Sequence, residues 1–298
     1  MEDLISVIIP TYHNRGGLRN SIDSVLSQEQ VNIEVIIVDD NDPDTDWRRK
    51  TELDMASYSD DHRVTYIRHK ANSNGAVARN TGIAASHGEF IAFLDDDDLF
   101  LPHKLKNQLD FLRKHLEFNG VYGQMIRSGK IVAIDLPEGN LARELLLLKT
   151  HLQTSTLMFR AQAIKEIGGF DESFYRHQDY EILLRYFAAG NIIGAIQTPV
   201  SEFGRNDGEN IPKGDRLEEI KSKFLATFDS YIKEFNSLTP GYMDSVYASQ
   251  YSGVFLGYLK NKEISKAWKI MRRYAFKSPL FFWQPILRNL KKHILHSC

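Results

Sequence analysis

Short apolar runs alternate with segments of helical periodicity over the first hundred residues. Runs rich in Val, Ile and Phe predict buried strands at 6–9, 33–38, 64–67 and 90–94. Between them, apolar residues recur every three or four positions at 18–26 and 76–86, which predicts amphipathic helices. This alternation is typical of βαβ units. We therefore expect an α/β fold with a mainly parallel sheet flanked by helices.

The remaining two thirds of the chain are more varied. We predict helices at 102–115 and 179–189 and short strands near 121–125 and 131–134. After Gly204 a loop-like linker leads to three or four helical segments, separated near 239–241, 261 and 278–279. The sequence thus predicts an α/β domain over residues 1–205 and a helical extension over residues 206–298.

Acidic residues follow two of the predicted strands. Asp39, Asp40 and Asp42 come after the second strand, and the run Asp95–Asp98 comes after the fourth. Ligands of parallel sheets gather beyond the carboxyl ends of strands, so both groups are expected to face one crevice. Crowded carboxylates require a cation or hydrogen-bond donors, and oxygen ligands suit Mg²⁺ or Mn²⁺. If the strand geometry continues, Asp95 and Asp97 point the same way. The alternative interpretation is a solvated acidic turn.

Five short segments occur in order along roughly residues 4–200. They are SVIIPTY at 6–12, VDDN at 38–41, NGAVARNTG at 74–82, GEFIAFLDDDD at 88–98, and GGFDE at 168–172 followed by DYE at 179–181 and Arg185. Together these segments resemble the motifs of family 2 inverting glycosyltransferases, which have the GT-A fold and include enzymes of bacterial polysaccharide, O-antigen and capsule synthesis. The ordered combination is far more specific than any single segment.

The resemblance implies roles for nine residues and a nucleotide-sugar donor, most simply a UDP-sugar. The donor would be bound by Pro10, Tyr12, Asp40, Arg79, Asn80, Asp95 and Asp96. Asp97 would bind Mn²⁺ or Mg²⁺, and Asp179 would be the catalytic base. A single base opposite the leaving group implies one in-line displacement that inverts the anomeric carbon. The first domain would then be the nucleotide-sugar-binding and catalytic domain, and the acceptor would be a hydroxyl of a glycan or lipid-linked glycan.

Three positions depart from the family pattern. His13 follows Tyr12 where the family usually has Asn, and Gln178 precedes Asp179 where it usually has Glu. Residues 202–207 contain no His, although many relatives place a metal-binding His in this region. The cation would then depend on Asp97, phosphate oxygens and water, or Asp207 would substitute for the missing ligand.

The charge of the chain is unevenly distributed. Residues 261–298 contain nine Lys or Arg and only one acidic residue, Glu263, so this tail carries +8 and the rest of the chain −10, for a net charge of −2. Aromatic residues are interleaved with the basic ones, a composition that suits an anionic membrane surface. A helical cap whose aromatic residues pack inward is an equally good interpretation. Nucleic acid is not an expected partner, because no recognition fold is visible.

Location is constrained only weakly by the sequence. The single cysteine, Cys298, excludes an intrachain disulfide and fits a reducing compartment. Residues 1–20 lack the order of a secretory signal, and no run approaches the roughly 18 apolar residues of a membrane-spanning helix. We expect a cytoplasmic protein, at most peripheral on the inner face of the membrane.

Two further hypotheses compete with glycosyl transfer. A catalytically silent nucleotide-sugar or glycan-binding module would be expected to lack the base or the metal ligand, whereas Asp179 and Asp97 are both present. A sugar nucleotidyltransferase would have a Gly-rich, basic loop after the first strand, which residues 10–17 resemble only faintly. A dinucleotide-dependent dehydrogenase is excluded because no Gly-x-Gly-x-x-Gly follows that strand.

Overall fold

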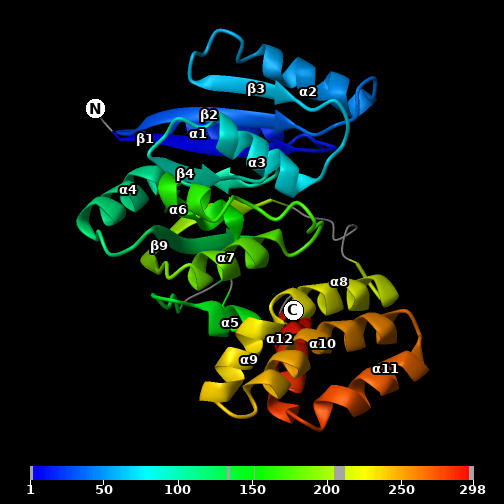
Figure 1. Cartoon of the computed structure of the whole chain (residues 1–298). Helices are drawn as coiled ribbons and strands as arrows, with labels where there is room; N and C mark the ends of the chain where they lie inside the picture. Colours follow the sequence, from blue (N-terminus) through cyan, green and yellow to red (C-terminus); the bar gives the residue numbers. More distant parts are fainter. Residues whose placement is uncertain (1–2, 133–134, 151, 205–211, 295–298) are drawn as a thin grey trace. The chain divides into compact units, whose positions relative to one another are not determined.

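The computed structural model describes residues 3–132, 135–150, 152–204 and 212–294, which divide into two compact units. The first unit comprises residues 1–141 and 152–207, and the second comprises 142–151 and 208–298. The predicted boundary at 205/206 therefore lies close to one division point, and a short internal segment is grouped with the C-terminal helices (Figure 1).

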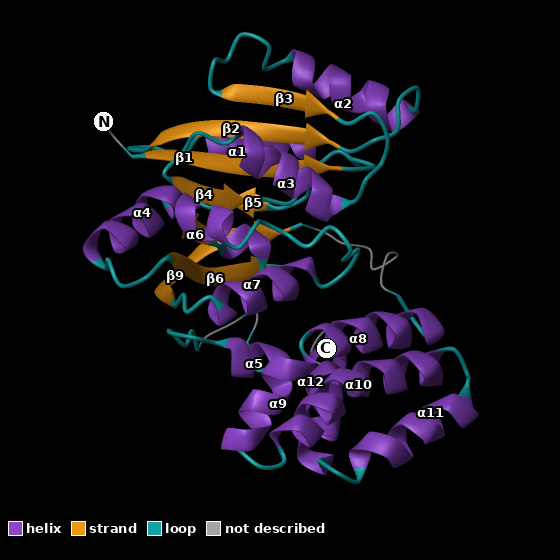
Figure 2. Cartoon of the chain, viewed as in Figure 1, coloured by secondary structure: helices purple, strands orange, loops and turns teal. Residues whose placement is uncertain are grey.

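The first unit is built on a nine-stranded sheet (Figure 2). Its strands are β1 (Leu4–Thr11), β2 (Asn32–Asp39), β3 (Val64–Arg68), β4 (Phe90–Phe93), β5 (Leu99–Phe100), β6 (Gly120–Arg127), β7 (Lys130–Ile131), β8 (Met158–Arg160) and β9 (Ile193–Phe203). Its helices are α1 (Leu18–Leu26), α2 (Asp46–Ala56), α3 (Gly75–Ala85), α4 (Lys104–Lys114), α6 (Ala161–Glu166) and α7 (Gln178–Ala188), with a 3₁₀ turn η1 (Thr154–Thr156).

The sheet is mixed but mostly parallel in its first half. The strand order is β3-β2-β1-β4-β8-β6-β9-β5, with β7 paired to β6. Strands β3, β2, β1 and β4 are parallel, as the sequence predicts, and so are β6 and β9. Strand β8 is antiparallel to both β4 and β6 and joins the two parallel groups. The carboxyl ends of β1, β2 and β4 therefore lie along one edge.

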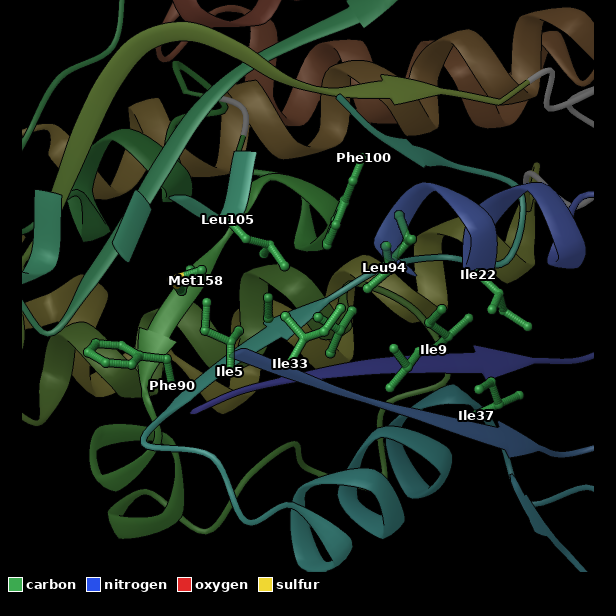
Figure 3. Packing of buried hydrophobic residues seen from close by; sticks show 14 of the residues in the cluster. Ile5, Ile9, Ile22, Ile33, Ile37, Phe90, Leu94, Phe100, Leu105 and Met158 are labelled. Carbon is green, nitrogen blue, oxygen red and sulfur yellow. The ribbon is translucent and has the colours of Figure 1, made fainter. Parts of the chain in front are cut away.

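Alternating residues of the strands fill two cores, one on each face of the sheet. Val35 and Ile37 of β2 belong to the cluster that contains Ile22 of α1, whereas Ile36 and Val38 pack with the α3 side. Figure 3 shows the larger cluster, in which side chains from β1, β2, β4 and α1 meet. Burial on both faces explains why these strands are continuous apolar runs.

The second unit consists of helices. They are α5 (Ala142–Leu146), α8 (Asp215–Thr227), α9 (Asp229–Leu238), α10 (Tyr242–Lys260), α11 (Ile264–Ile270), the π-helical turn η2 (Met271–Ala275) and α12 (Pro279–Ile294). The described residues after 211 thus form five α-helices, and the prediction of three or four was wrong. It missed the break between α8 and α9, because Phe228 separates them without any Gly or Pro.

Hydrogen bonds from α10 attach the internal segment to this unit. The Gln250 amide donates to the carbonyl of Leu146 at 2.8 Å, and the Ser249 hydroxyl donates to that of Leu147 at 2.7 Å. These bonds pair carbonyls at the end of α5 that have no partner within so short a helix. No described helix of either unit is long and apolar enough to cross a membrane.

Candidate active site

The acidic run after β4 forms a tight turn. The ladder ends with Leu94, whose N–H donates to Ile8, and the Asp98 N–H then donates to the Asp95 carbonyl at 3.0 Å. This bond spans three residues, which is the pattern of a β-turn. The extended geometry therefore does not continue through the acidic run, so the condition under which Asp95 and Asp97 were expected to point the same way is not met.

Hydrogen bonds from other segments hold the first two carboxylates of this turn. Arg79 forms an ion pair with Asp95 at 2.6 Å. The Thr11 hydroxyl donates to Asp96 at 2.5 Å, and the N–H of Tyr12 also donates to the Asp96 carboxylate. Asp95 is thereby fixed to the middle of α3, and Asp96 to the end of β1.

The last two carboxylates differ sharply from each other. Asp98 is buried and accepts hydrogen bonds from the Ser155 hydroxyl at 2.6 Å and from the Gly204 N–H at 2.9 Å. Asp97 is exposed. In the described part of the chain, its carboxylate accepts no hydrogen bond from another residue and forms no ion pair. Asp97 is thus the member of the turn that is free to take an external ligand.

Burial and mutual repulsion make this cluster hard to ionise. Burial raises the pKa of Asp96 to about 7. The hydrogen bond from Thr11 lowers this pKa, whereas the negative charges of Asp97 and Asp95 raise it further. Burial and the Asp95 charge also raise the pKa of Asp98. Partial desolvation by the surrounding turn and the Asp95 charge raise the pKa of Asp97 as well, although its side chain is exposed. A cation or hydroxyl donors bound at the turn would offset these costs.

Two glycines allow the backbone to approach the acidic turn. A Cβ on Gly17, in the loop after β1, would lie 2.6 Å from the Asp96 carbonyl oxygen. A Cβ on Gly204, after β9, would lie 1.8 Å from the Asp97 carbonyl oxygen. The turn is therefore packed between two segments that tolerate no side chain at these points.

Substituting Gly204 tests this packing. We expect Gly204→Ala to lower the free energy of unfolding by about 1–3 kcal/mol, because the methyl group must displace the backbone at Asp97. Gly253→Ala is the matched control, because a Cβ at this position in α10 meets nothing within 4 Å. Chemical denaturation of both variants measures the difference, and equal stabilities would refute the packing argument.

Asp179 lies in the first turn of α7, close to Arg79 and Asp95. Burial raises the pKa of Asp179 to about 6, the Asp95 charge contributes to the rise, and the Arg79 charge opposes it. Arg79 also donates to the side chain of Gln178 at 2.8 Å. Gln178, which stands where the family usually has Glu, is thus hydrogen-bonded to Arg79. The same guanidinium pairs with Asp95 of the acidic turn and lies close to Asp179, the predicted base.

Asp40 organises the loop that precedes α3. Its carboxylate accepts from the ring of His69 at 2.8 Å, the Asn72 amide at 2.9 Å, the Ser73 N–H at 2.8 Å and the Asn74 N–H at 2.9 Å. A carboxylate has about four acceptor sites, so these donors occupy all of them. Contact between Asp40 and the donor remains a prediction, whereas its role in the loop is evident.

Asn80 fastens a second loop, before α7. Its amide donates to the carbonyl of Phe170 at 2.9 Å and to Glu172 at 2.9 Å, and its oxygen accepts from the Phe170 N–H at 2.8 Å. Glu181 and Arg185 pair with each other and bond the same loop from the other side. Asn80 therefore holds this loop, and its predicted contact with the donor remains a prediction.

Aromatic rings line the end of β1. Pro10 is half-buried as the penultimate residue of the strand, and Tyr12 beyond it is 45% exposed. The Tyr12 ring stacks on His13 with centroids 3.8 Å apart, and His13 stacks on Trp47 of α2 at 5.1 Å. His13 therefore continues an aromatic stack, which an Asn at this position would not.

Some site residues have no signal in the sequence. Ser155, Gly17 and Gly204 all contact the acidic turn, but they lie 57 or more positions from their partners and outside the five motifs. Thr11 also contacts the turn and lies within the first motif, which assigns it no role. Asp207, the predicted substitute metal ligand, lies outside the described residues. Among those described, no group of three or more His, Cys, Asp or Glu side chains is placed to hold a metal ion.

Comparison with known sequences identifies the family. The profile of the family described as Glycosyl transferase family 2 matches residues 6–168, which is more than half of the chain. The chain belongs to glycosyl transferase family 2. It is 30% identical over 216 residues to the amylovoran biosynthesis glycosyltransferase AmsB of Erwinia amylovora, a match covering 68% of this chain and 70% of that protein.

Other family 2 relatives are longer than the matched region. The match to an uncharacterized glycosyltransferase of Rickettsia bellii, at 32% identity, covers 63% of this chain but 28% of the relative. For a Rickettsia typhi relative at 31% identity, the coverage is 60% of the relative. The chain thus spans less than two thirds of the length of these two relatives.

Among solved structures, the S. aureus TarS fragment 1–349 matches with a TM-score of 0.63 and 18% identity, covering 91% of each chain. At this identity the likeness establishes the fold alone. The mixed, mostly parallel sheet flanked by helices is the GT-A fold, with C-terminal helices following it. The fold that the sequence motifs imply is therefore confirmed.

Proposed function

We propose that this chain transfers a sugar from a nucleoside diphosphate, UDP in the first instance, to a hydroxyl of a glycan or lipid-linked glycan, with inversion. Membership of family 2 supports the reaction class. The observation that carries the proposal is that Asp95 forms an ion pair with Arg79 and lies close both to the free carboxylate of Asp97 and to the half-buried carboxylate of Asp179. A raised pKa beside specific charged partners is typical of catalytic carboxylates, which favours an enzyme over a silent binding module.

The donor is proposed to lie along the carboxyl ends of β1, β2 and β4. The exposed ring of Tyr12 offers a surface on which a base can stack, and Pro10 borders it. The carboxylates of Asp95 and Asp96 are acceptors for ribose hydroxyls at the same edge. TarS structures in complex with UDP-GlcNAc and with UDP support a uridine donor for a chain of this fold.

The residues present fit a cation of the Mg²⁺ or Mn²⁺ type that is shared with the donor. Asp97 is a single exposed oxygen ligand, and the described residues hold no three-ligand cage. Mg²⁺ is usually held in this way, by one or two carboxylates together with substrate phosphates and water. When bound, such an ion would neutralise the charge that develops on the departing diphosphate.

Asp179 is proposed to act as the general base. It takes the proton of the acceptor hydroxyl while that oxygen bonds to the anomeric carbon, and the bond from this carbon to the diphosphate breaks with its electron pair leaving on the phosphate. One base and one displacement give the product the opposite anomeric configuration. Arg79 holds Asp95 at the donor side and lies near enough to Asp179 to favour its ionised form.

The pH dependence follows from the raised pKa of Asp179. Asp179 is a base only when deprotonated, so activity is expected to be full above the pKa of about 6 and to fall about tenfold per pH unit below it. We would measure kcat/KM for the acceptor as a function of pH at saturating donor. This profile reports the pKa values of ionisable groups in the enzyme–donor complex before the acceptor binds. A profile that stays level to pH values well below 6 would exclude Asp179 as the base.

A further inference from the structure

Helix α11 and the π-helical turn η2 present two different faces. Ala267 and Ile270 are buried where α11 packs on α10, and Tyr274 is buried in a stack with Tyr251 at 4.2 Å. Figure 1 shows α11 at the edge of the helical unit. The opposite face, which we call the α11 face, consists of Ile264, Ser265, Trp268, Lys269, Arg272, Arg273, Phe276 and Leu280.

Large apolar side chains on the α11 face are left in water. Trp268 is 55% exposed, Phe276 72% and Leu280 70%, and Ile264 is exposed as well. Ile264 and Trp268 lie on α11, Phe276 follows η2, and Leu280 lies in the first turn of α12; we call these four residues the stripe. Single exposed apolar residues are ordinary, but four large ones within seventeen residues favour a surface that binds a partner.

Basic side chains flank the stripe. Lys269, Arg272 and Arg273 line an open pocket of about 350 Å³ together with Ser265 and Trp268. An indole beside two guanidinium groups and an ammonium group offers an anionic ligand both charge and hydrogen-bond donors. The pocket therefore has the chemistry of a phosphate site bordered by an apolar surface.

Nearby acidic residues do not neutralise this charge. Lys266 engages Asp215 at 2.7 Å and Glu263 at 2.9 Å, and Lys277 engages Asp244 at 3.4 Å. Over the described residues, Lys269, Arg272 and Arg273 form no ion pair, and the Arg273 guanidinium lies over the ring of Tyr274. The positive charge of the α11 face is thus available to an external partner.

We propose that the α11 face docks on an anionic lipid bilayer. Trp268, Phe276 and Leu280 would enter the boundary between headgroups and acyl chains, while Lys269 and Arg272 bind lipid phosphates. Phe282 and Ile286 of α12 are buried within the helical unit and are unavailable to lipid, whereas Trp283 and Leu287 of the same helix are exposed. The proposal does not depend on the catalytic assignment, although it would bring the enzyme to lipid-linked acceptors.

Co-sedimentation of the full chain with vesicles tests the proposal. Vesicles of phosphatidylcholine with one third phosphatidylglycerol are expected to bind the protein, and pure phosphatidylcholine vesicles are not. Lys269→Gln with Arg272→Gln should weaken binding about fivefold per charge removed, equivalent to ~1 kcal/mol for each basic residue. Trp268→Ser with Phe276→Ser should abolish it. Tryptophan emission should shift to the blue with anionic vesicles, and this shift should be lost in Trp268→Phe.

Matched variants outside the α11 face serve as controls. Lys114→Gln with Lys130→Gln removes two exposed charges elsewhere, and Leu53→Ser with Leu116→Ser removes two exposed apolar side chains. Both control pairs should bind vesicles as the wild type does. No binding to anionic vesicles, equal losses in test and control pairs, or binding of inorganic phosphate or an anionic polysaccharide in place of vesicles would each overturn the proposal.

Discussion

Asp179→Asn is expected to lower turnover by about 10²–10⁴-fold, the usual contribution of a positioned general base. The amide keeps the size of the side chain but cannot take the acceptor proton. Because Asp179 lies in the first turn of α7 and bonds no residue of the acidic turn, the donor should bind with unchanged affinity. Calorimetric donor binding and steady-state turnover on one preparation separate the two effects.

Conservative replacement sharpens this test. Asp179→Glu restores a carboxylate and should recover part of the lost rate, whereas a purely structural role for Asp179 would make the longer side chain at least as harmful as the amide. Near-native turnover of Asp179→Asn would remove this residue as the base and leave the silent-module hypothesis or another carboxylate to be examined.

Asp97→Asn should abolish the cation-dependent part of donor binding. We expect donor affinity in the presence of Mn²⁺ to fall by at least about 100-fold, since losing even an outer contact of a metal site costs 10–100-fold. The fold should survive, because the side chain of Asp97 is exposed and bonds no other described residue. Calorimetry with Mn²⁺ and with chelator measures the cation-dependent difference.

Asp44→Asn is the matched control for this variant. Asp44 is an exposed aspartate in the loop after β2, and its φ of 64° suits asparagine equally well. The Asp44→Asn substitution removes one negative charge from a loop at this edge of the sheet and leaves the acidic turn unchanged. Equal donor affinities of Asp97→Asn and Asp44→Asn with Mn²⁺ present would contradict the assignment of Asp97.

The parallel half of the sheet could be predicted because its signals are local. Strands β1, β2 and β4 are buried on both faces, so each is a short continuous apolar run, and the helices between them carry one apolar face. Strand β9 is longer and was not predicted, because it mixes buried and exposed residues and pairs with β6 through register shifts. Its pattern matches neither a strict alternation nor a buried run.

The sequence indicates which residue types form the candidate site, but it does not indicate how they are arranged. Sequence motifs pointed to Asp95–Asp98 and Asp179, and both lie around Arg79. They did not indicate that Asp98 is buried and accepts a hydrogen bond from Ser155. Nor did they indicate that N–H groups of the loop before α3 donate to the carboxylate of Asp40. Such contacts join residues far apart in the chain, and no local periodicity encodes them.

Titration of the full chain with UDP and a panel of UDP-sugars, with Mn²⁺ and then with chelator, tests the central claim most directly. If the edge formed by β1, β2 and β4 is a donor site, UDP and one preferred UDP-sugar will bind with Mn²⁺ and release with chelator. If no nucleoside diphosphate or nucleotide-sugar binds in either condition, the acidic turn is not a donor site and the proposed transferase function is contradicted.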